Sequence, residues 1–280
     1  MLRICLYMIL INLTHNVMAQ EQRPEPDRKL IYKTIGDVEL QLHVFDPVED
    51  GDRRSAIVFF FGGGWNGGNP SQFYPHCRHL ADQGMVAMAA DYRVKSRNDT
   101  SPFECVQDGK SALRWVRSHA NELKIDPGHI AAGGGSAGGH VAAAVATVPN
   151  LNEPSESTEI SCVPNALVLF NPVYDNGPEG YGYDRVKDRY LEISPLHNIR
   201  EGMPPAIVFL GTKDNLIPVA IAKAFQKKMR DVGSRSELML FEGEPHGFFN
   251  FGRGDGSNYK STVAAMDEFL ASLGFLNAAE

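Results

Sequence analysis

Three polar residues have side chains and a chain order that suit nucleophilic acyl chemistry. Ser136, Asp214 and His246 each follow a short hydrophobic run of the chain. A serine hydroxyl becomes an effective nucleophile when an imidazole accepts its proton, and a buried carboxylate fixes the tautomer of that imidazole. The sequence therefore predicts that Ser136 is a nucleophile, His246 its base and Asp214 the residue that orients His246.

The segment around Ser136 has the pattern G-x-S-x-G, formed with Gly134 and Gly138. The apolar run 130–132 precedes it and the alanine-rich run 141–144 follows it, which predicts a strand, a tight turn and a helix. In a chain with 27 glycines, this motif alone is also compatible with a flexible turn carrying an ordinary serine. The positions of its two partners favour the catalytic interpretation.

The elements that must position these residues are predicted strands that alternate with helices from residue 55 onward. Open α/β sheets of this kind form their sites at the carboxyl ends of the strands, where all three residues fall. An antiparallel hairpin around Gly36-Asp37 precedes the alternating part. The expected strands are 30–35, 38–45, 55–61, 85–92, one that begins at residue 130 and leads to the serine turn, 166–170, 206–210 and 237–241. The expected helices are 71–83, 103–123, 137–148, 218–231 and 260–273, with Ser71 the candidate N-cap of the first and a turn at 125–128. The predicted fold is one α/β domain with a mostly parallel sheet and helices on both faces.

Each partner of Ser136 also has a plainer interpretation. Asp214 alone suits a turn, and His246 alone suits a surface loop. Glu244 is a rival acid because it lies near His246, but it belongs to the same loop and follows no separate strand. We therefore prefer Asp214, because three suitable residues after successive strands are hard to explain as coincidence.

A glycine-rich loop follows the first buried strand of the alternating part. Backbone amides held in such a loop stabilise the oxyanion of a tetrahedral intermediate, since they need no reorganisation. We expect such donors in the loop Gly62-Gly63-Gly64, with a further donor at Ala137, directly after the nucleophile.

Together these motifs resemble the α/β-hydrolase esterases of the hormone-sensitive-lipase-like group, including acetyl- and feruloyl-esterase-type enzymes. The resemblance covers roughly residues 55–272. It rests on phrases that recur in that group, namely Phe61-Gly62-Gly63-Gly64-Trp65, Asp91-Tyr92-Arg93, the run 134–140, Ser194-Pro195-Leu196, Asp214 and His246-Gly247-Phe248. It implies an α/β-hydrolase fold, a serine esterase, and an oxyanion hole at Gly63, Gly64 and Ala137. One departure is Phe61, which stands where the family usually has a histidine that holds this loop by polar contacts, so packing must hold it here.

Four aromatic residues are candidates for contact with the substrate. Trp65 is expected to wall the acyl pocket, with core packing an equal alternative. Tyr174 and Tyr181 suit either the alcohol side of the site or the filling of a small cap, and Phe248 lies beside His246. The cap is expected over residues 173–199, a stretch rich in Gly, Tyr and Pro without a sustained period.

No metal or organic cofactor is expected. His76 and His79 lie three residues apart on a predicted helix, but no further ligand stands at a suitable spacing.

The N-terminus has the features of an export signal. Residues 1–19 contain a basic start, an apolar run and a small-residue cleavage site, so we expect a signal peptide, a mature tail at 20–29 and the domain at 30–280. The apolar run is too short to span a bilayer, which disfavours an uncleaved anchor. The expected location is secreted or periplasmic.

After cleavage of the signal peptide three cysteines would remain, with one disulfide or three free thiols equally compatible: Cys77, Cys105 and Cys162.

Charge narrows the classes of partner. The net charge of −7 becomes −8 when the single arginine of the signal is removed, and no basic cluster remains. Nucleic acid and anionic membrane surfaces are therefore disfavoured as partners, and the oligomeric state is left open.

The sequence predicts an exported serine esterase for short-chain carboxylic esters, with acetyl groups on polysaccharides or their fragments as the favoured substrates. An exopeptidase or lactone hydrolase on the same residues is the alternative. A non-catalytic binding protein of the same fold is disfavoured, because neither the serine nor the histidine is lost.

Overall fold

The computed structural model describes residues 23–49, 51 and 53–277. The predicted signal peptide at 1–19 and the start of the predicted tail lie outside these residues. The first strand begins at Arg28, two residues before the predicted start of the domain. Within the described residues, no helix combines the length and the apolar character needed to cross a membrane.

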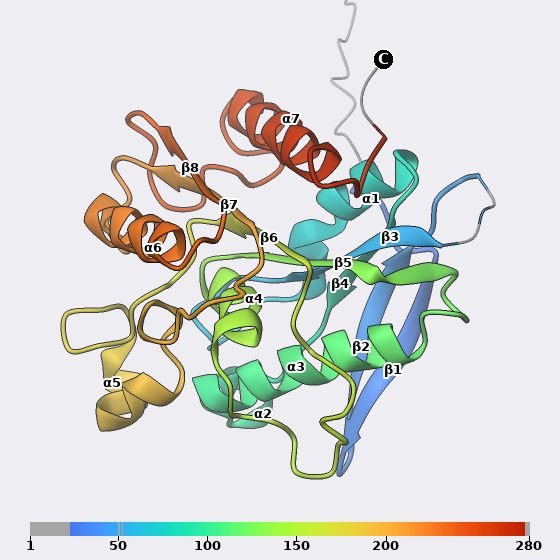
Figure 1. Ribbon diagram of the computed structural model, residues 1–280, viewed down its shortest axis with the longest axis horizontal. Coiled ribbons are helices and arrows are strands. Elements are labelled where there is room, and N and C mark those ends of the chain that lie inside the picture. The colour runs from blue at the N-terminus through green and yellow to red at the C-terminus, as the bar shows by residue number, and fades with distance from the viewer. Residues whose placement is uncertain (1–22, 50, 52, 278–280) are drawn as a thin grey trace, which may run out of the picture.

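An eight-stranded sheet runs through the molecule in the order β1-β2-β4-β3-β5-β6-β7-β8 (Figure 1). The pairs β1–β2 and β2–β4 are antiparallel, and all other neighbours are parallel. The strands are β1 (Arg28–Ile35), β2 (Val38–Phe45), β3 (Arg54–Phe60), β4 (Val86–Ala90), β5 (Ile125–Gly135), β6 (Ala166–Phe170), β7 (Ala206–Gly211) and β8 (Ser236–Phe241). This confirms the predicted mostly parallel α/β sheet.

Helices cover both faces of the sheet, as predicted (Figure 1). Helices α1 and α7 pack on one face, and α3, α4 and α6 pack on the other. The helices are α1 (Tyr74–Asp82), α2 (Lys95–Asn98), α3 (Pro102–Ser118), α4 (Ala137–Thr147), α5 (Tyr183–Val186), α6 (Val219–Asp231) and α7 (Ser257–Ala271), with 3-10 turns η1 (Pro70–Phe73), η2 (Lys187–Glu192) and η3 (Pro195–His197).

Strand β3 shows why the central runs are apolar throughout. Val58 and Phe60 join the core on the α3 and α4 side, whereas Ile57 and Phe59 join the core on the α1 and α7 side. Because successive side chains of a strand point to opposite faces, a strand covered on both faces must be hydrophobic at every position.

Two predicted boundaries were wrong for local reasons. Asn69, not Ser71, caps the first helical segment, because its side chain accepts a hydrogen bond from the Ser71 amide. The long helix α3 ends at Ser118 rather than at residue 123, and residues 119–124 form turns. The predicted turn at 125–128 is an irregularity inside β5, where the register against β3 shifts between Arg54 and Ala56.

A buried ionic cluster ties the N-terminal hairpin to α3. The Lys33 ammonium lies 2.8 Å from Asp108 and 2.7 Å from Glu153, and Arg93 lies 2.8 Å from Asp108. The Asp108 side chain has no exposed surface, so its charge is stabilised by these cations rather than by water. In the Asp91-Tyr92-Arg93 segment, Arg93 thus pairs with Asp108, while Asp91 pairs with Arg97.

Candidate active site

Ser136 occupies the sharp turn between β5 and α4. Its backbone has φ 54° and ψ −119°, a conformation that costs energy for a residue with a side chain. Its amide donates to the Phe170 carbonyl at 2.9 Å, which helps to fix the turn against β6. A Cβ at Gly138 would lie 2.0 Å from the Phe60 carbonyl oxygen, so only glycine allows α4 to approach β3 this closely.

His246 lies between Ser136 and Asp214. Its Nε2 is 2.9 Å from the Ser136 hydroxyl, and its Nδ1 is 2.7 Å from Asp214 Oδ2. Because a carboxylate only accepts hydrogen bonds, Nδ1 carries the proton and Nε2 presents its lone pair to the serine hydroxyl. The predicted residues from the ends of β5, β7 and β8 are thus brought together, and Asp214 rather than Glu244 is bonded to His246.

Asp214 is held by its own loop. Its Oδ1 accepts hydrogen bonds from the amides of Leu216 and Ile217, each at 2.9 Å. The carboxylate has no exposed surface, and the His246 side chain is 21% exposed. The acid is therefore buried and fixed, while the imidazole faces the open side of the site.

Asn171 is a site residue that the sequence analysis missed. It follows β6, is fully buried, and has a left-handed backbone with φ 34°. Its Oδ1 accepts from the Gly247 amide at 2.9 Å, and its Nδ2 lies 3.5 Å from His246 Nε2. Asn171 thereby supports the loop after β8 that carries His246 and Gly247, which we call the histidine loop. It does so from the end of β6, which lies between β5 and β7 in the sheet. Its position directly after an apolar strand was the signal that could have revealed it.

The glycine loop after β3 lies against the Ser136 turn. A Cβ at Gly62 would lie 3.0 Å from the Gly135 carbonyl oxygen and 3.4 Å from Ser136 Cβ. Within the described residues, the amides of Gly63 and Gly64 donate to no backbone carbonyl. Ala137 begins α4, so its amide belongs to the first turn, where no carbonyl of the helix itself can accept it. The predicted donors Gly63 and Gly64 thus directly follow Gly62, which contacts the serine turn, and Ala137 directly follows Ser136.

Packing holds this loop at Phe61, as the missing family histidine led us to expect. The Phe61 ring stacks on Tyr92 with a centroid distance of 4.1 Å, and the Tyr92 hydroxyl donates to the Phe61 carbonyl at 2.6 Å. Both side chains are buried. A polar contact is present as well, because the Gly62 amide donates to Gln72 Oε1 at 2.6 Å.

The predicted cap at 173–199 consists of α5, η2, η3 and connecting loops. It touches the glycine loop through Arg185, which donates to the Gly64 carbonyl at 2.6 Å. The Arg185 guanidinium lies 5.5 Å from the ring centroids of both Trp65 and Tyr181. Arg185 therefore joins the cap to the loop through a hydrogen bond and cation–π contacts.

The predicted aromatic substrate contacts need correction. Tyr174 is fully buried and stacks on Phe225, and Phe248 is buried beside Phe241, so both belong to the core. Trp65 is only 1% exposed and packs edge-on against His140, which agrees with the core alternative. Tyr181, by contrast, is partly exposed in the cap.

The remaining histidines and cysteines lie outside this arrangement. His76 is buried among aromatic rings, and His79 bonds to Asp267 at 2.7 Å. No group of three or more His, Cys, Asp or Glu side chains in the described part of the chain is placed to hold a metal ion. The cysteines are free buried thiols: Cys77, Cys105 and Cys162.

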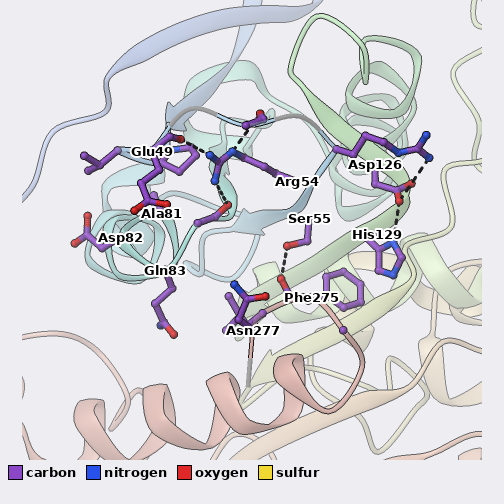
Figure 2. Close-up of a pocket in the computed structure, with 17 residues that line it drawn as sticks. Glu49, Arg54, Ser55, Ala81, Asp82, Gln83, Asp126, His129, Phe275 and Asn277 are labelled. Carbon is purple, nitrogen blue, oxygen red and sulfur yellow. Dashed lines mark hydrogen bonds and ion pairs between the residues drawn. The ribbon is translucent and has the colours of Figure 1, made fainter. Parts of the chain in front are cut away.

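Two cavities differ in their relation to the site. A cavity of about 690 Å³ lies at the amino ends of β3 and β5, where Arg54, Ser55 and His129 line it (Figure 2). This is the opposite end of the strands from Ser136. A cavity of about 390 Å³ lies beside the glycine loop and is lined by Gly62 and Gly63.

An open, mostly parallel sheet with a serine turn after β5, an acid after β7 and a histidine after β8 defines the α/β-hydrolase class. Two family models match the chain, BD-FAE over residues 42–169 and the dienelactone hydrolase family over residues 181–279. The chain belongs to the α/β-hydrolase esterases of the hormone-sensitive-lipase-like group. This confirms the family that the motifs predicted.

Solved structures and curated relatives support this assignment. Thermogutta terrifontis esterase 2 phosphorylated by paraoxon is 48% identical, with a TM-score of 0.87 over 92% of this chain and 98% of that chain. The butyrate-bound form of that esterase is 48% identical, with a TM-score of 0.86 over 90% and 96%. The probable carboxylic ester hydrolase LipM of Mycobacterium tuberculosis is 32% identical over 76% of this chain and 53% of its own length. An acetylxylan esterase of Xylanibacter ruminicola is 26% identical over 83% of this chain and 48% of its own length. The chain spans about half the length of these two curated relatives.

Proposed function

We propose that the protein is a serine carboxylesterase that forms an acyl-enzyme on Ser136. The main support for this proposal is the continuous series of hydrogen bonds from Ser136 through His246 to Asp214, at 2.9 Å and 2.7 Å. Such a series lets the imidazole accept the serine proton as the hydroxyl oxygen attacks an ester carbonyl.

The reaction proceeds in two halves. Ser136 Oγ bonds to the carbonyl carbon while its proton moves to His246 Nε2, and the resulting oxyanion accepts hydrogen bonds from Gly63, Gly64 and Ala137. His246 then gives the proton to the departing alcohol, which leaves the acyl group on Ser136. Water, deprotonated by His246, attacks the acyl carbon, and the bond from that carbon to Ser136 Oγ then breaks. The carboxylic acid leaves, and the proton held by His246 regenerates the serine hydroxyl.

We propose short acyl groups as substrates. The cap contains only one-turn helices and 3-10 turns, so it offers no long apolar cover for a fatty chain. The related Thermogutta esterase has been solved with butyrate bound, which supports the same range.

We propose a hydroxylated alcohol component, such as an acetylated polysaccharide or its fragments. The 390 Å³ cavity beside the glycine loop is lined by the polar side chains of Asn69, Ser71, Gln72 and Asn250. Amide and hydroxyl groups of this kind suit the hydroxyls of a sugar. The similarity to an acetylxylan esterase also supports this choice.

We further propose export from the predicted signal at 1–19, which N-terminal sequencing of the mature protein tests, with Gln20 expected first.

A chain-length series on nitrophenyl esters tests the acyl specificity. We expect kcat/KM to be highest for acetate to butyrate, and a preference for C8 or longer would contradict the proposal.

Ser136→Ala should lower kcat by about 10⁴-fold or more, because nucleophile and base act as one unit. Wild-type turnover by Ser136→Ala would overturn the mechanism. The alcohol component is tested by comparing kcat/KM for acetylated sugars with kcat/KM for simple acetates.

Lactone hydrolysis is the second candidate, favoured by the match of residues 181–279 to the dienelactone hydrolase family. It uses the same acyl-enzyme, with the alcohol retained on the acyl group. Turnover of lactones above that of open-chain esters of the same acid would favour this candidate.

A further inference from the structure

Two side-chain amides connect the glycine loop to the histidine loop. Gln72, in the turn η1, accepts a hydrogen bond from the Gly62 amide at 2.6 Å. Its Nε2 donates to Asn250 Oδ1 at 2.9 Å. Asn250 Nδ2 in turn donates to the Gly247 carbonyl at 2.8 Å.

These three hydrogen bonds all run in the same direction. Each amide side chain accepts at its oxygen and donates from its nitrogen, so each bond polarises the next. The ends of this amide relay, Gly62 and Gly247, are neighbours in the chain of residues that take part in the reaction. Gly62 precedes the expected oxyanion donors, and Gly247 directly follows His246.

The relay stands where the loop needs a polar attachment. Phe61 presents only a ring and a carbonyl to Tyr92, so its side chain offers no hydrogen bond. Gln72 supplies that hydrogen bond one residue later, at Gly62. Asn171 holds the Gly247 amide from the other side at 2.9 Å, so both polar groups of Gly247 are fixed by asparagines.

We infer that Gln72 and Asn250 are positioning residues that set the oxyanion donors and His246 in register with each other. This inference rests on the proposed esterase mechanism. The oxyanion forms beside one loop while the proton moves to the other, so a relative displacement of the loops lowers the rate of both halves of the reaction.

The test uses full-length protein with Gln72→Met, Asn250→Leu and the double variant. Each substitution preserves approximate size and removes the relay. Gln226→Met is the matched control. It deletes one amide hydrogen bond, to the Ser236 carbonyl, which lies at the start of β8 and therefore at the opposite end of the strands from the active site. Paraoxon titration gives the concentration of active serine, so kcat is measured per titrated site with a nitrophenyl acetate substrate.

We expect each single variant to lower kcat for nitrophenyl acetate by about 10- to 100-fold. KM for this ester should stay within about twofold, because it lacks the sugar hydroxyls that the cavity lined by Gln72 and Asn250 is proposed to bind. The double variant should match the worse single variant, because either substitution breaks the same relay. The Gln226→Met control should stay within twofold of wild type.

Three results would overturn the inference: kcat per titrated site within twofold of wild type in both single variants, a change confined to KM, or losses that multiply in the double variant. If Gln72→Met does not fold, Gln72→Glu replaces it, because a carboxylate still accepts from Gly62 but cannot donate to Asn250.

Ser136→Ala is assayed beside these variants to separate the two proposals. Turnover at the wild-type rate by Ser136→Ala would remove the serine mechanism and the relay's role together. An inactive Ser136→Ala with unimpaired relay variants would remove only the positioning role.

Discussion

Asp214 accepts three hydrogen bonds through two carboxylate oxygens. Oδ1 receives the amides of Leu216 and Ile217, and Oδ2 receives His246 Nδ1. The two backbone amides, rather than the imidazole, therefore fix which carboxylate oxygen faces His246.

Asp214→Asn should therefore lower kcat by about 10⁴-fold while leaving the fold intact. The amide oxygen must face the Leu216 and Ile217 amides, so the new NH₂ group faces His246 Nδ1 and forces the proton onto Nε2. That tautomer cannot accept the serine proton. Steady-state kinetics with nitrophenyl acetate and the circular dichroism spectrum check this, and a loss below tenfold would contradict the assignment of the acid.

The catalytic residues were predictable because each follows a predicted strand and because their order along the chain, Ser-Asp-His, is constrained. Ser136, Asp214 and His246 could be found for this reason. Gln72 and Asn250 could not, since a side-chain amide in a loop carries no pattern that distinguishes a support from a solvated residue. Asn171 was missed although it directly follows the apolar strand β6. Tyr174 and Phe248 were placed at the substrate for a related reason, because an aromatic ring has the same sequence signature in a core and in a pocket.

At the scale of elements, the strand-turn-helix unit β5–Ser136–α4 depends on close approach of two backbones. Gly138 lies where a Cβ would be 2.0 Å from the Phe60 oxygen and 2.4 Å from the Phe61 oxygen. Both contacts are to backbone, so neither can move aside without displacing β3.

Gly138→Ala should lower the free energy of unfolding by about 3 kcal/mol, the upper end for overpacking by one methyl group. Urea denaturation followed by fluorescence measures this. Gly67→Ala is the control, because the nearest atom to its new Cβ is the Ser96 hydroxyl oxygen at 3.7 Å. Equal stability of the two variants would show that α4 can shift without cost.

Element types and order followed from the sequence because buried parallel strands are continuous apolar runs. The ends of elements did not follow, since a cap depends on which side chain reaches the amide. Asn69 rather than Ser71 does so at the first helical segment. The loop at 149–165 was also overlooked, although its Glu153 completes the buried ionic cluster with Lys33.

At the scale of the whole molecule, buried histidines make stability depend on pH. Burial lowers the pKa of His76 to about 3, with a smaller contribution from His79, and burial lowers the pKa of His140 to about 4 despite its bond to Asn176. The unfolded chain binds these protons near pH 6.5, so it holds more protons than the folded chain between these values. Stability is therefore fully present above about pH 6.5 and falls as the solution is acidified.

His76→Phe should reduce this acid sensitivity. The wild-type His76 contributes a loss of about 2 kcal/mol between pH 7.5 and pH 5, from 1.36 kcal/mol per pH unit below 6.5. A phenyl ring fits the surrounding aromatic residues and does not titrate. Urea unfolding at both pH values measures the difference, and an unchanged pH dependence would show that His76 is not its source.

The active edge gathers residues that are far apart in the chain, and this sets the moment at which activity arises during synthesis. Ser136 and His246 are separated by 110 residues, and the histidine belongs to the loop after the last strand. At about 5–20 residues per second, a ribosome releases His246 some 5–20 s after Ser136. The nascent chain carries its nucleophile for that interval without a base, so it cannot cleave esters before the sheet is complete. Turnover in a translation reaction therefore reports chains that have been made at least through His246.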